Sequence, residues 1–251
     1  MNAGGDARGA PVVVVPPSDK SSALGRKIYA LLVGGRRYFG SAGASLTQVL
    51  DNPDQDSGFG RGVVQVGLDA ERSTSQLIRR WMADKPDVVL CDSVHVRGYG
   101  GVDGEGDTDH VLLCGRSVLL VDTKRWKSRR KYSFNSSGAV LRSGRVFAGG
   151  RLGMRGALGI WRKHMPGCRV DGVVCVNSER VFVVYDAAWK RQPFHLVTVE
   201  RLVEQLDYWY GRADRGRVEC DMVARVAAMC VKPYDAVRTL FGGSPREIGL
   251  V

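Results

Sequence analysis

Two carboxylates and an ammonium group stand out as candidates for chemistry in this sequence: Asp109, Asp122 and Lys124. Facing carboxylates repel each other, and apolar neighbours raise that cost, so a chain that brings them together usually needs them. Their simplest use is to bind a hard divalent cation through oxygen ligands. Whether they can do so depends on the elements that position them.

The segment that carries these residues has the pattern of a β-hairpin. Apolar runs at Val111–Cys114 and Val118–Val121 flank the dipeptide Gly115-Arg116, which is typical of two strands joined by a tight turn. Such a turn places the two aspartates directly opposite each other, with Cβ atoms about 4.5–5.5 Å apart, and the lysine on the face of the second aspartate. The same spacing also fits a first aspartate that ends a loop and an exposed ion pair at the strand tip.

A third carboxylate, Glu71, belongs to a predicted helix over Leu68–Ala83, which Asp69 is able to cap. Glu71 precedes the apolar Ile78 by seven residues, so it lies on the core-facing side of this helix. The alternative is a solvent-exposed glutamate that favours the positive end of the helix dipole.

The remaining pattern predicts an α/β fold. Both faces of the hairpin are apolar, as in strands at the centre of a sheet that is covered on both sides. The sequence predicts further strands at Val88–Arg97, Arg169–Val176 and Val181–Tyr185, and helices at Gly150–Met165, Val199–Tyr210 and 217–242. We therefore expect a mixed central β-sheet flanked by helices.

Composition divides the chain into four parts. Residues 1–25 are rich in Gly, Ala, Pro and Ser and are expected to form a disordered arm; residues 26–62 hold a short helical segment and a linker. The core domain is expected at 63–212, followed by a helical C-terminal extension at 213–251.

The charge balance favours a polyanionic partner. The 251 residues include 37 basic and 26 acidic side chains, a net charge of +11, which favours nucleic acid over a membrane surface. Six cysteines without any C-x-x-C pair indicate buried free thiols in a reducing compartment. No segment has the roughly 20 apolar residues of a membrane span, and the N-terminus lacks the pattern of a signal peptide. A cytoplasmic location is expected.

Six of the eight residues in Lys124–Lys131 are basic, and this run follows the carboxylates directly. Together with Trp126, Tyr132 and Phe134, these cations suit phosphate contacts and stacking on exposed bases. A solvated surface loop is the alternative.

The four histidines, His95, His110, His164 and His195, are dispersed, and we expect none of them to be catalytic. The sequence also lacks the G-x-S-x-G pattern and the paired Cys–His spacing of nucleophilic catalysis.

The ordered set of motifs resembles the nuclease-related domain (NERD) family of the PD-(D/E)xK nuclease superfamily. The matching residues are Ala70-Glu71 in the first helix, Asp107-Thr108-Asp109-His110 before an apolar strand, and Asp122-Thr123-Lys124 on the next strand. The similarity covers roughly Gly67 to Tyr210. Ala70 stands where the family usually has glycine, and Gly150–Met165 contains no glutamine where relatives often carry one.

The resemblance implies a restriction-endonuclease-like core and metal-dependent hydrolysis of a phosphodiester. It implies that Asp109 and Asp122 hold Mg²⁺ or Mn²⁺, with the backbone carbonyl of Thr123 and with Glu71, either directly or through water. Lys124 would orient or deprotonate the attacking water, or stabilise developing charge. Backbone contacts read charge and not sequence, so little sequence specificity is expected. The predicted nucleic-acid-binding residues are Arg125, Trp126, Lys127, Arg129, Arg130 and Lys131.

Two other functions stay open. The missing glutamine in Gly150–Met165 is compatible with a nucleic-acid-binding module that keeps the nuclease fold without turnover. The basic run is also compatible with an interaction protein that binds an acidic partner. Among nucleic acids, DNA is favoured over RNA.

Overall fold

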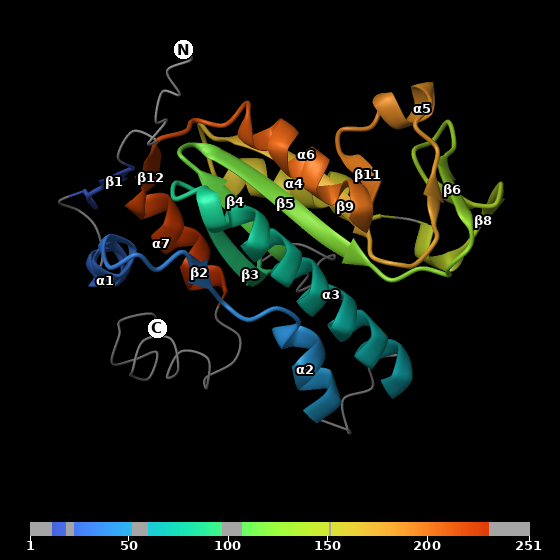
Figure 1. Cartoon of the computed structure of the whole chain (residues 1–251), viewed down its shortest axis with the longest axis horizontal. Coiled ribbons are helices and arrows are strands. Elements are labelled where there is room, and N and C mark those ends of the chain that lie inside the picture. Colours follow the sequence, from blue (N-terminus) through green and yellow to red (C-terminus); the bar gives the residue numbers. More distant parts are fainter. Residues whose placement is uncertain (1–11, 19–22, 52–59, 97–106, 151, 231–251) are drawn as a thin grey trace, which may run out of the picture.

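The central element of the computed structural model, which describes residues 12–18, 23–51, 60–96, 107–150 and 152–230, is a six-stranded mixed sheet (Figure 1). Its strand order is β11-β9-β5-β4-β3-β2. β3, β4 and β5 are antiparallel neighbours, whereas β5, β9 and β11 run parallel. The strands are β2 (Tyr38–Phe39), β3 (Val89–His95), β4 (Asp107–Cys114), β5 (Ser117–Lys124), β9 (Arg169–Val176) and β11 (His195–Thr198). The mixed α/β architecture expected from the sequence is confirmed.

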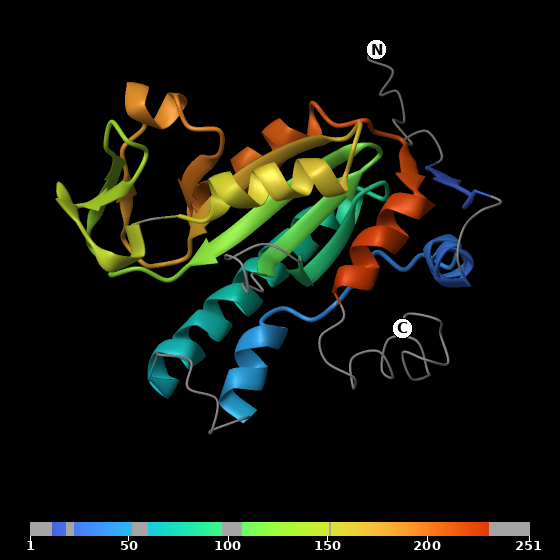
Figure 2. The ribbon, with the colours of Figure 1, turned by 180° about the vertical axis from the view of Figure 1, so that it is seen from behind.

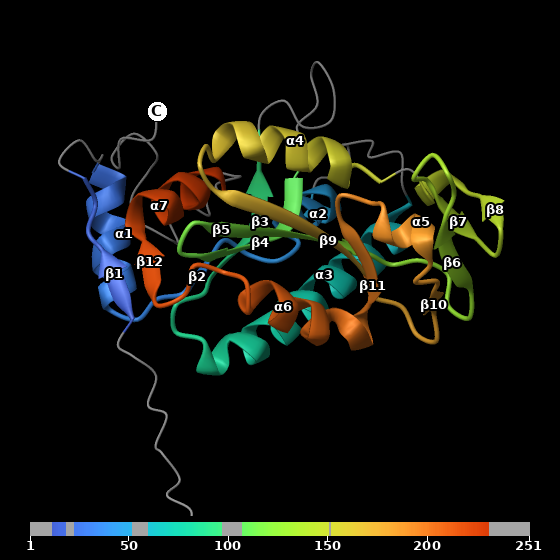
Figure 3. The same ribbon diagram turned by 90° about the horizontal axis from the view of Figure 1, so that it is seen from above.

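Helices cover both faces of this sheet (Figures 1, 2 and 3). On one face, Ile78 and Leu206 from α3 (Arg61–Trp81) and α6 (Leu202–Tyr210) pack against the apolar side chains of β4 and β5. The other face carries α1 (Ala23–Val33), α4 (Met154–His164) and α7 (Cys220–Met229). Coverage on both sides explains why the central strands read as uninterrupted apolar runs.

Helix α3 begins at Arg61, earlier than the predicted start at Leu68. Asp69 therefore lies inside the helix and accepts a hydrogen bond from Gln65, 2.9 Å away, instead of capping the first turn. The apolar stripe extends upstream because Val64 and Leu68, four residues apart, are both buried.

The segments outside the predicted core contribute elements to the fold. Val13–Val15 form β1, which pairs in parallel with β12 (Arg217–Glu219), so part of the predicted arm lies against part of the predicted C-terminal extension. β2 joins the central sheet beside β3, and α2 (Ala44–Asp51) packs on α3. Residues 1–11 of the arm, and Pro233 with the rest of 231–251, lie outside the described residues.

A second, four-stranded sheet lies beyond the C-terminal end of β5 (Figure 3). Its order is β10-β6-β7-β8, with β6 (Lys131–Phe134), β7 (Val140–Arg142), β8 (Arg145–Val146) and β10 (Phe182–Val183). The strand predicted over Val181–Tyr185 is thus shorter than expected. A short helix, α5 (Ala187–Lys190), and single 3-10 turns at Met82–Asp84, Ala148–Gly150 and Val199–Arg201 complete the described elements.

All six cysteines are free, and five of them are buried, as expected. Among the helices in the described part of the chain, none combines the length and apolar character needed to cross a membrane.

Candidate active site

The hairpin of β4 and β5 has the predicted turn and register. Gly115 adopts a positive φ of 51°, and a Cβ there would clash with the backbone oxygen of Asp214, so only glycine fits. His110 pairs with Val121 in the last pair of the ladder, and the Thr123 N–H bonds to the Asp109 side chain just beyond it, so Asp109 and Asp122 lie at the same end of the hairpin. The positions that the sequence predicted to face each other are therefore adjacent.

Asp109 is buried at the end of β4, and its Oδ2 accepts a hydrogen bond from the backbone N–H of Thr123, 2.5 Å away. Lys124 donates to Asp122 Oδ1 at 2.8 Å. This ion pair is only partly exposed, with 35% of the lysine and 17% of the aspartate side chain accessible, so it is not the freely solvated pair of the alternative hypothesis.

Glu71 joins this group from α3. Its side chain is buried, and burial together with the charges of Asp107 and Asp122 raises the pKa of Glu71 to about 8, against the lowering effect of Lys124. Burial, followed by the charges of Glu71 and Asp122, likewise raises the pKa of Asp109 well above its ordinary value. The four predicted side chains thus share one electrostatic environment, and the solvent-exposed alternative for Glu71 is wrong.

The first turn of α2 and the residues before it lie next to the carboxylates. Ser45 donates a hydrogen bond to Asp107. Gly43 has a φ of 73°, and a Cβ at this position would lie 3.7 Å from Glu71 Oε2 and clash with Leu68. No local sequence pattern indicates these contacts, because α2 and the carboxylates are far apart along the chain.

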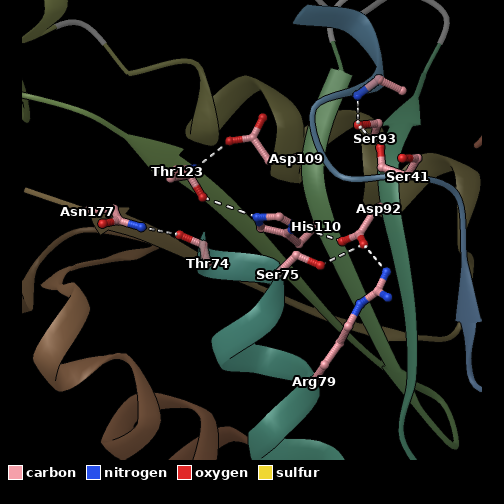
Figure 4. A network of polar contacts seen from close by, with 11 residues as sticks. Ser41, Thr74, Ser75, Arg79, Asp92, Ser93, Asp109, His110, Thr123 and Asn177 are labelled. Atoms are coloured by element: carbon pink, nitrogen blue, oxygen red, sulfur yellow. Dashed lines mark hydrogen bonds and ion pairs between the residues drawn. The ribbon is translucent and has the colours of Figure 1, made fainter. Parts of the chain in front are cut away.

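A buried polar network supports the hairpin from the face covered by α3 (Figure 4). Asp92 on β3 accepts from Ser75 Oγ at 2.8 Å and from Arg79 Nη2 at 3.0 Å, and it contacts His110 Nδ1 at 2.7 Å. Burial alone would raise the pKa of Asp92, but these hydrogen bonds outweigh burial and hold it below the ordinary value.

His110 connects this network to the β4–β5 hairpin, since its Nε2 lies 3.3 Å from Thr123 Oγ1. The chain of contacts runs from Asp92 through His110 and Thr123 to Asp109. His110 therefore has a structural role that its isolated position in the sequence did not indicate. The missed signal was the cross-strand pairing of Asp92 with His110, which requires knowing where β3 and β4 begin.

Asn177, just after β9, ties that strand to α3 and β5. Its Nδ2 donates to the backbone oxygen of Ala70 at 3.0 Å and to Thr74 Oγ1 at 2.9 Å, and its N–H donates to the backbone oxygen of Lys124. Arg125 Nη1 in turn donates to the backbone oxygen of Asn177 at 2.8 Å. These bonds fix α3 next to Glu71 and the end of β5 at Lys124 relative to each other.

The basic run Lys124–Lys131 begins at the end of β5, two residues after Asp122. Its exposed cations are Arg125, Lys127, Arg129, Arg130 and Lys131. Two aromatic side chains proposed to stack on bases are not available for it, because Tyr132 and Phe134 on β6 are buried in the core. Trp126 is partly buried and packs on Tyr132 and Phe147, with ring centroids 4.7 Å and 5.3 Å away.

The donor chemistry of the site fits a hard divalent cation. Among the described residues, no three His, Cys, Asp or Glu side chains form a group arranged to hold a metal ion. Magnesium usually takes only one or two carboxylates and completes its shell with water and substrate phosphate, and Asp109 and Asp122 match that number and type. Burial first, and then the neighbouring carboxylates, raise the pKa values of Glu71 and Asp109, and a bound cation would stabilise their charged forms.

Comparison with known proteins gives only distant likenesses. No protein-family model and no curated protein matches the chain. Can2 from Sulfobacillus thermosulfidooxidans, in complex with cyclic tetra-adenylate, is 15% identical with a TM-score of 0.36, over 75% of this chain and 51% of that one. VC1899 from Vibrio cholerae is 11% identical with a TM-score of 0.35, over 77% of this chain and 58% of that one. This chain thus spans little more than half the length of each.

Proposed function

We propose that the protein is a divalent-metal-dependent nuclease that hydrolyses phosphodiester bonds with little sequence specificity, as its resemblance to the NERD family implies. The observation that carries this proposal is the grouping of Glu71, Asp109, Asp122 and Lys124 at one end of the central sheet. A mixed sheet with antiparallel β3, β4 and β5 and a helix that supplies the glutamate agrees with the proposed restriction-endonuclease-like core.

The carboxylates of Asp109 and Asp122 and the backbone carbonyl of Thr123 would hold Mg²⁺ or Mn²⁺, and Glu71 would contribute directly or through a bound water. Such a cation, when bound, lowers the pKa of a water ligand and neutralises charge on the scissile phosphate. The hydrogen bond from Thr123 to Asp109 keeps one carboxylate oxygen in place and leaves the other for a ligand.

Lys124 is the proposed positioning and proton-handling group. Its Nζ, now bonded to Asp122 Oδ1, can orient the attacking water or donate a hydrogen bond to the phosphate oxygen that gains charge. In the reaction, a water oxygen forms a bond to phosphorus and the bond to the leaving sugar oxygen breaks, with one proton lost from the water and one gained by the leaving group.

The exposed cations that follow Lys124 would track the phosphate backbone. Contacts of this kind depend on charge and position the strand without reading bases. The net charge of +11 gives the long-range attraction that such binding requires. Among polyanions we propose DNA in preference to RNA.

A cleavage assay tests the proposal. Supercoiled plasmid, single-stranded DNA and RNA are incubated with Mg²⁺ or Mn²⁺ and the wild-type protein, Asp122→Ala or Lys124→Ala, with EDTA as the metal-free control. We expect cutting that needs metal and is abolished in both variants. Tight, salt-sensitive binding without any cutting would support the inactive nucleic-acid-binding module instead.

A further inference from the structure

A row of aromatic rings lies at the free edge of the central sheet, away from the residues assigned to hydrolysis. Tyr185, Trp189 on α5, His195 on β11 and Tyr208 on α6 follow one another, with successive ring centroids 5.2, 4.8 and 6.3 Å apart. Burial lowers the pKa of His195, which favours the neutral form of its ring. Four rings, from the stretch 185–189, β11 and α6, therefore line one surface.

These rings line an open cleft of about 370 Å³. This volume falls within the range of about 300–1,000 Å³ that is typical of small-ligand sites. Arginine side chains lie against both ends of the row, with the guanidinium of Arg201 4.4 Å from the Tyr185 ring centroid and that of Arg212 5.0 Å from Tyr208. Glu204, which also lines the cleft, accepts from Arg201 Nε at 2.6 Å and offsets its charge. The cleft thus combines aromatic walls with an ion pair at one end and the Arg212 guanidinium at the other.

A smaller polar cavity of about 70 Å³ shares His195, Gln205 and Tyr208 with this cleft. Its lining adds a carboxylate and an amide, from Asp171 and Gln192. Trp209, 2% exposed, also lines it, and its Nε1–H is buried without a hydrogen-bond partner in the described part of the chain. An unpaired buried donor of this kind is costly unless a ligand or water accepts from it.

This combination suits a nucleobase more than other flat or apolar ligands. A base stacks its faces on aromatic rings and presents both donors and acceptors at its edge, which amides, a carboxylate and an indole N–H can meet. A proline side chain has no polar edge to use the inner cavity. A quaternary ammonium group has neither donors nor acceptors for the polar groups of the inner cavity, and Arg212 lies against one end of the row.

The cleft lies close to the proposed active site. Val197, which lines the cleft, pairs with Cys175, and Cys175 pairs on its other side with Thr123. Two strand spacings of about 4.8 Å put the cleft on the order of 10 Å from the Thr123–Asp109 contact. β11 and the end of β5 lie at the same end of the sheet (Figure 1).

We propose that this aromatic cleft binds an unstacked base of a single-stranded nucleic acid whose backbone lies along the basic run. This proposal rests on the proposed function as a nuclease. The cleft then selects strands with accessible bases, such as single strands, over fully paired duplex.

The affinity of the protein for single-stranded oligonucleotides, measured in EDTA so that no cleavage occurs, tests this proposal. Fluorescence anisotropy measures the Kd of a labelled single-stranded oligonucleotide and of an abasic strand with the same phosphates. We expect Tyr208→Leu to weaken binding of the base-containing strand about 5- to 150-fold, the equivalent of one stacking interaction, and to leave abasic binding unchanged. Tyr208→Phe keeps the ring and is expected to bind like the wild type.

Tyr29→Leu, the same change on α1, is the matched control and is expected to change neither Kd. Equal weakening of both strands by Tyr208→Leu, or an effect no larger than that of Tyr29→Leu, would overturn the proposal. Binding of a free mononucleotide that no strand displaces would also overturn it. If the Tyr208→Leu protein still cuts but loses this base-dependent affinity, the cleft is confirmed as a base-binding site. If the wild type binds strands through the cleft but never cuts, only the proposed nuclease activity is refuted.

Discussion

The Asp92 carboxylate and the His110 imidazole face each other across β3 and β4, 2.7 Å apart, and neither side chain has any solvent exposure. Ser75 and Arg79 donate to the second oxygen of the same carboxylate, so one aspartate holds α3 against both strands. Through His110, this contact supports Thr123, which in turn binds Asp109. The network is the link between the core of the fold and the candidate active site.

Replacing Asp92 with leucine should therefore destabilise the protein strongly. Three donors would lose their acceptor, and breaking a buried pair of this kind costs about 3–5 kcal/mol. The free energy of unfolding in urea measures the loss. Asp84→Leu is the control, because the Asp84 side chain is 79% exposed and a surface change of this kind stays within about 0.5 kcal/mol. Similar values for the two variants would contradict the account of the network.

The stability of the metal-free protein should fall as the pH rises towards 8. Glu71 has an ordinary pKa of 4.5 in the unfolded chain and a pKa of about 8 in the fold, so between these values the folded state binds more protons. The free energy of unfolding then decreases with increasing pH, and the raised pKa of Asp109 acts in the same direction.

Thermal melts in EDTA between about pH 5 and about pH 8 test this, with Glu71→Gln expected to give a shallower decline because it carries no ionisable group. Added Mg²⁺ should raise the melting temperature of the wild type more at the upper end of the range, where the carboxylates are charged. Identical slopes for the wild type and Glu71→Gln would show that the fold does not raise the pKa of this carboxylate.

The basic run should determine the salt dependence of nucleic-acid binding. Removing one phosphate-binding cation reduces the slope of log K against log salt by about 0.7–0.9. Lys127→Ala and Arg130→Ala are each expected to show this reduction in a fluorescence titration. Lys163→Ala, an exposed lysine in the last turn of α4, should leave the slope unchanged. A slope unaffected by the first two variants would place the phosphate-binding cations elsewhere.

Tyr132 should matter for stability and not for base stacking. Its ring is fully buried beneath the basic run, and its hydroxyl donates to the backbone oxygen of Lys127 at 3.0 Å. Tyr132→Ala is expected to lower the free energy of unfolding by about 3–5 kcal/mol, as for other large buried aromatic residues. The ratio of affinities for base-containing and abasic strands should stay as in the wild type; a fall in that ratio would contradict the buried position.

The sequence predicts the features that depend on local pattern. It does not predict the features that depend on contacts between residues far apart in the chain. The hairpin register follows from two apolar runs and a glycine turn, so Asp109, Asp122 and Lys124 could be placed correctly. The pairing of Asp92 with His110 depends on the register between β3 and β4, two strands that residues 97–106 separate in the sequence. No local pattern encodes this register. Tyr132 resembles an exposed ring next to cations, yet a second small sheet buries it.

Single-turnover cleavage of a labelled single-stranded oligonucleotide, with protein in excess and Mg²⁺ present, separates a catalytic role of Lys124 from a role in binding. At saturating protein, differences in binding drop out, and Lys124→Met should slow cleavage by about 10²- to 10⁴-fold, as expected for loss of a proton-handling group. Lys127→Met, three residues further along the same basic run, should cleave at the wild-type rate. Equal rates for the wild type and Lys124→Met, or no metal-dependent cleavage by the wild type, would contradict the assignment of this site as a nuclease centre.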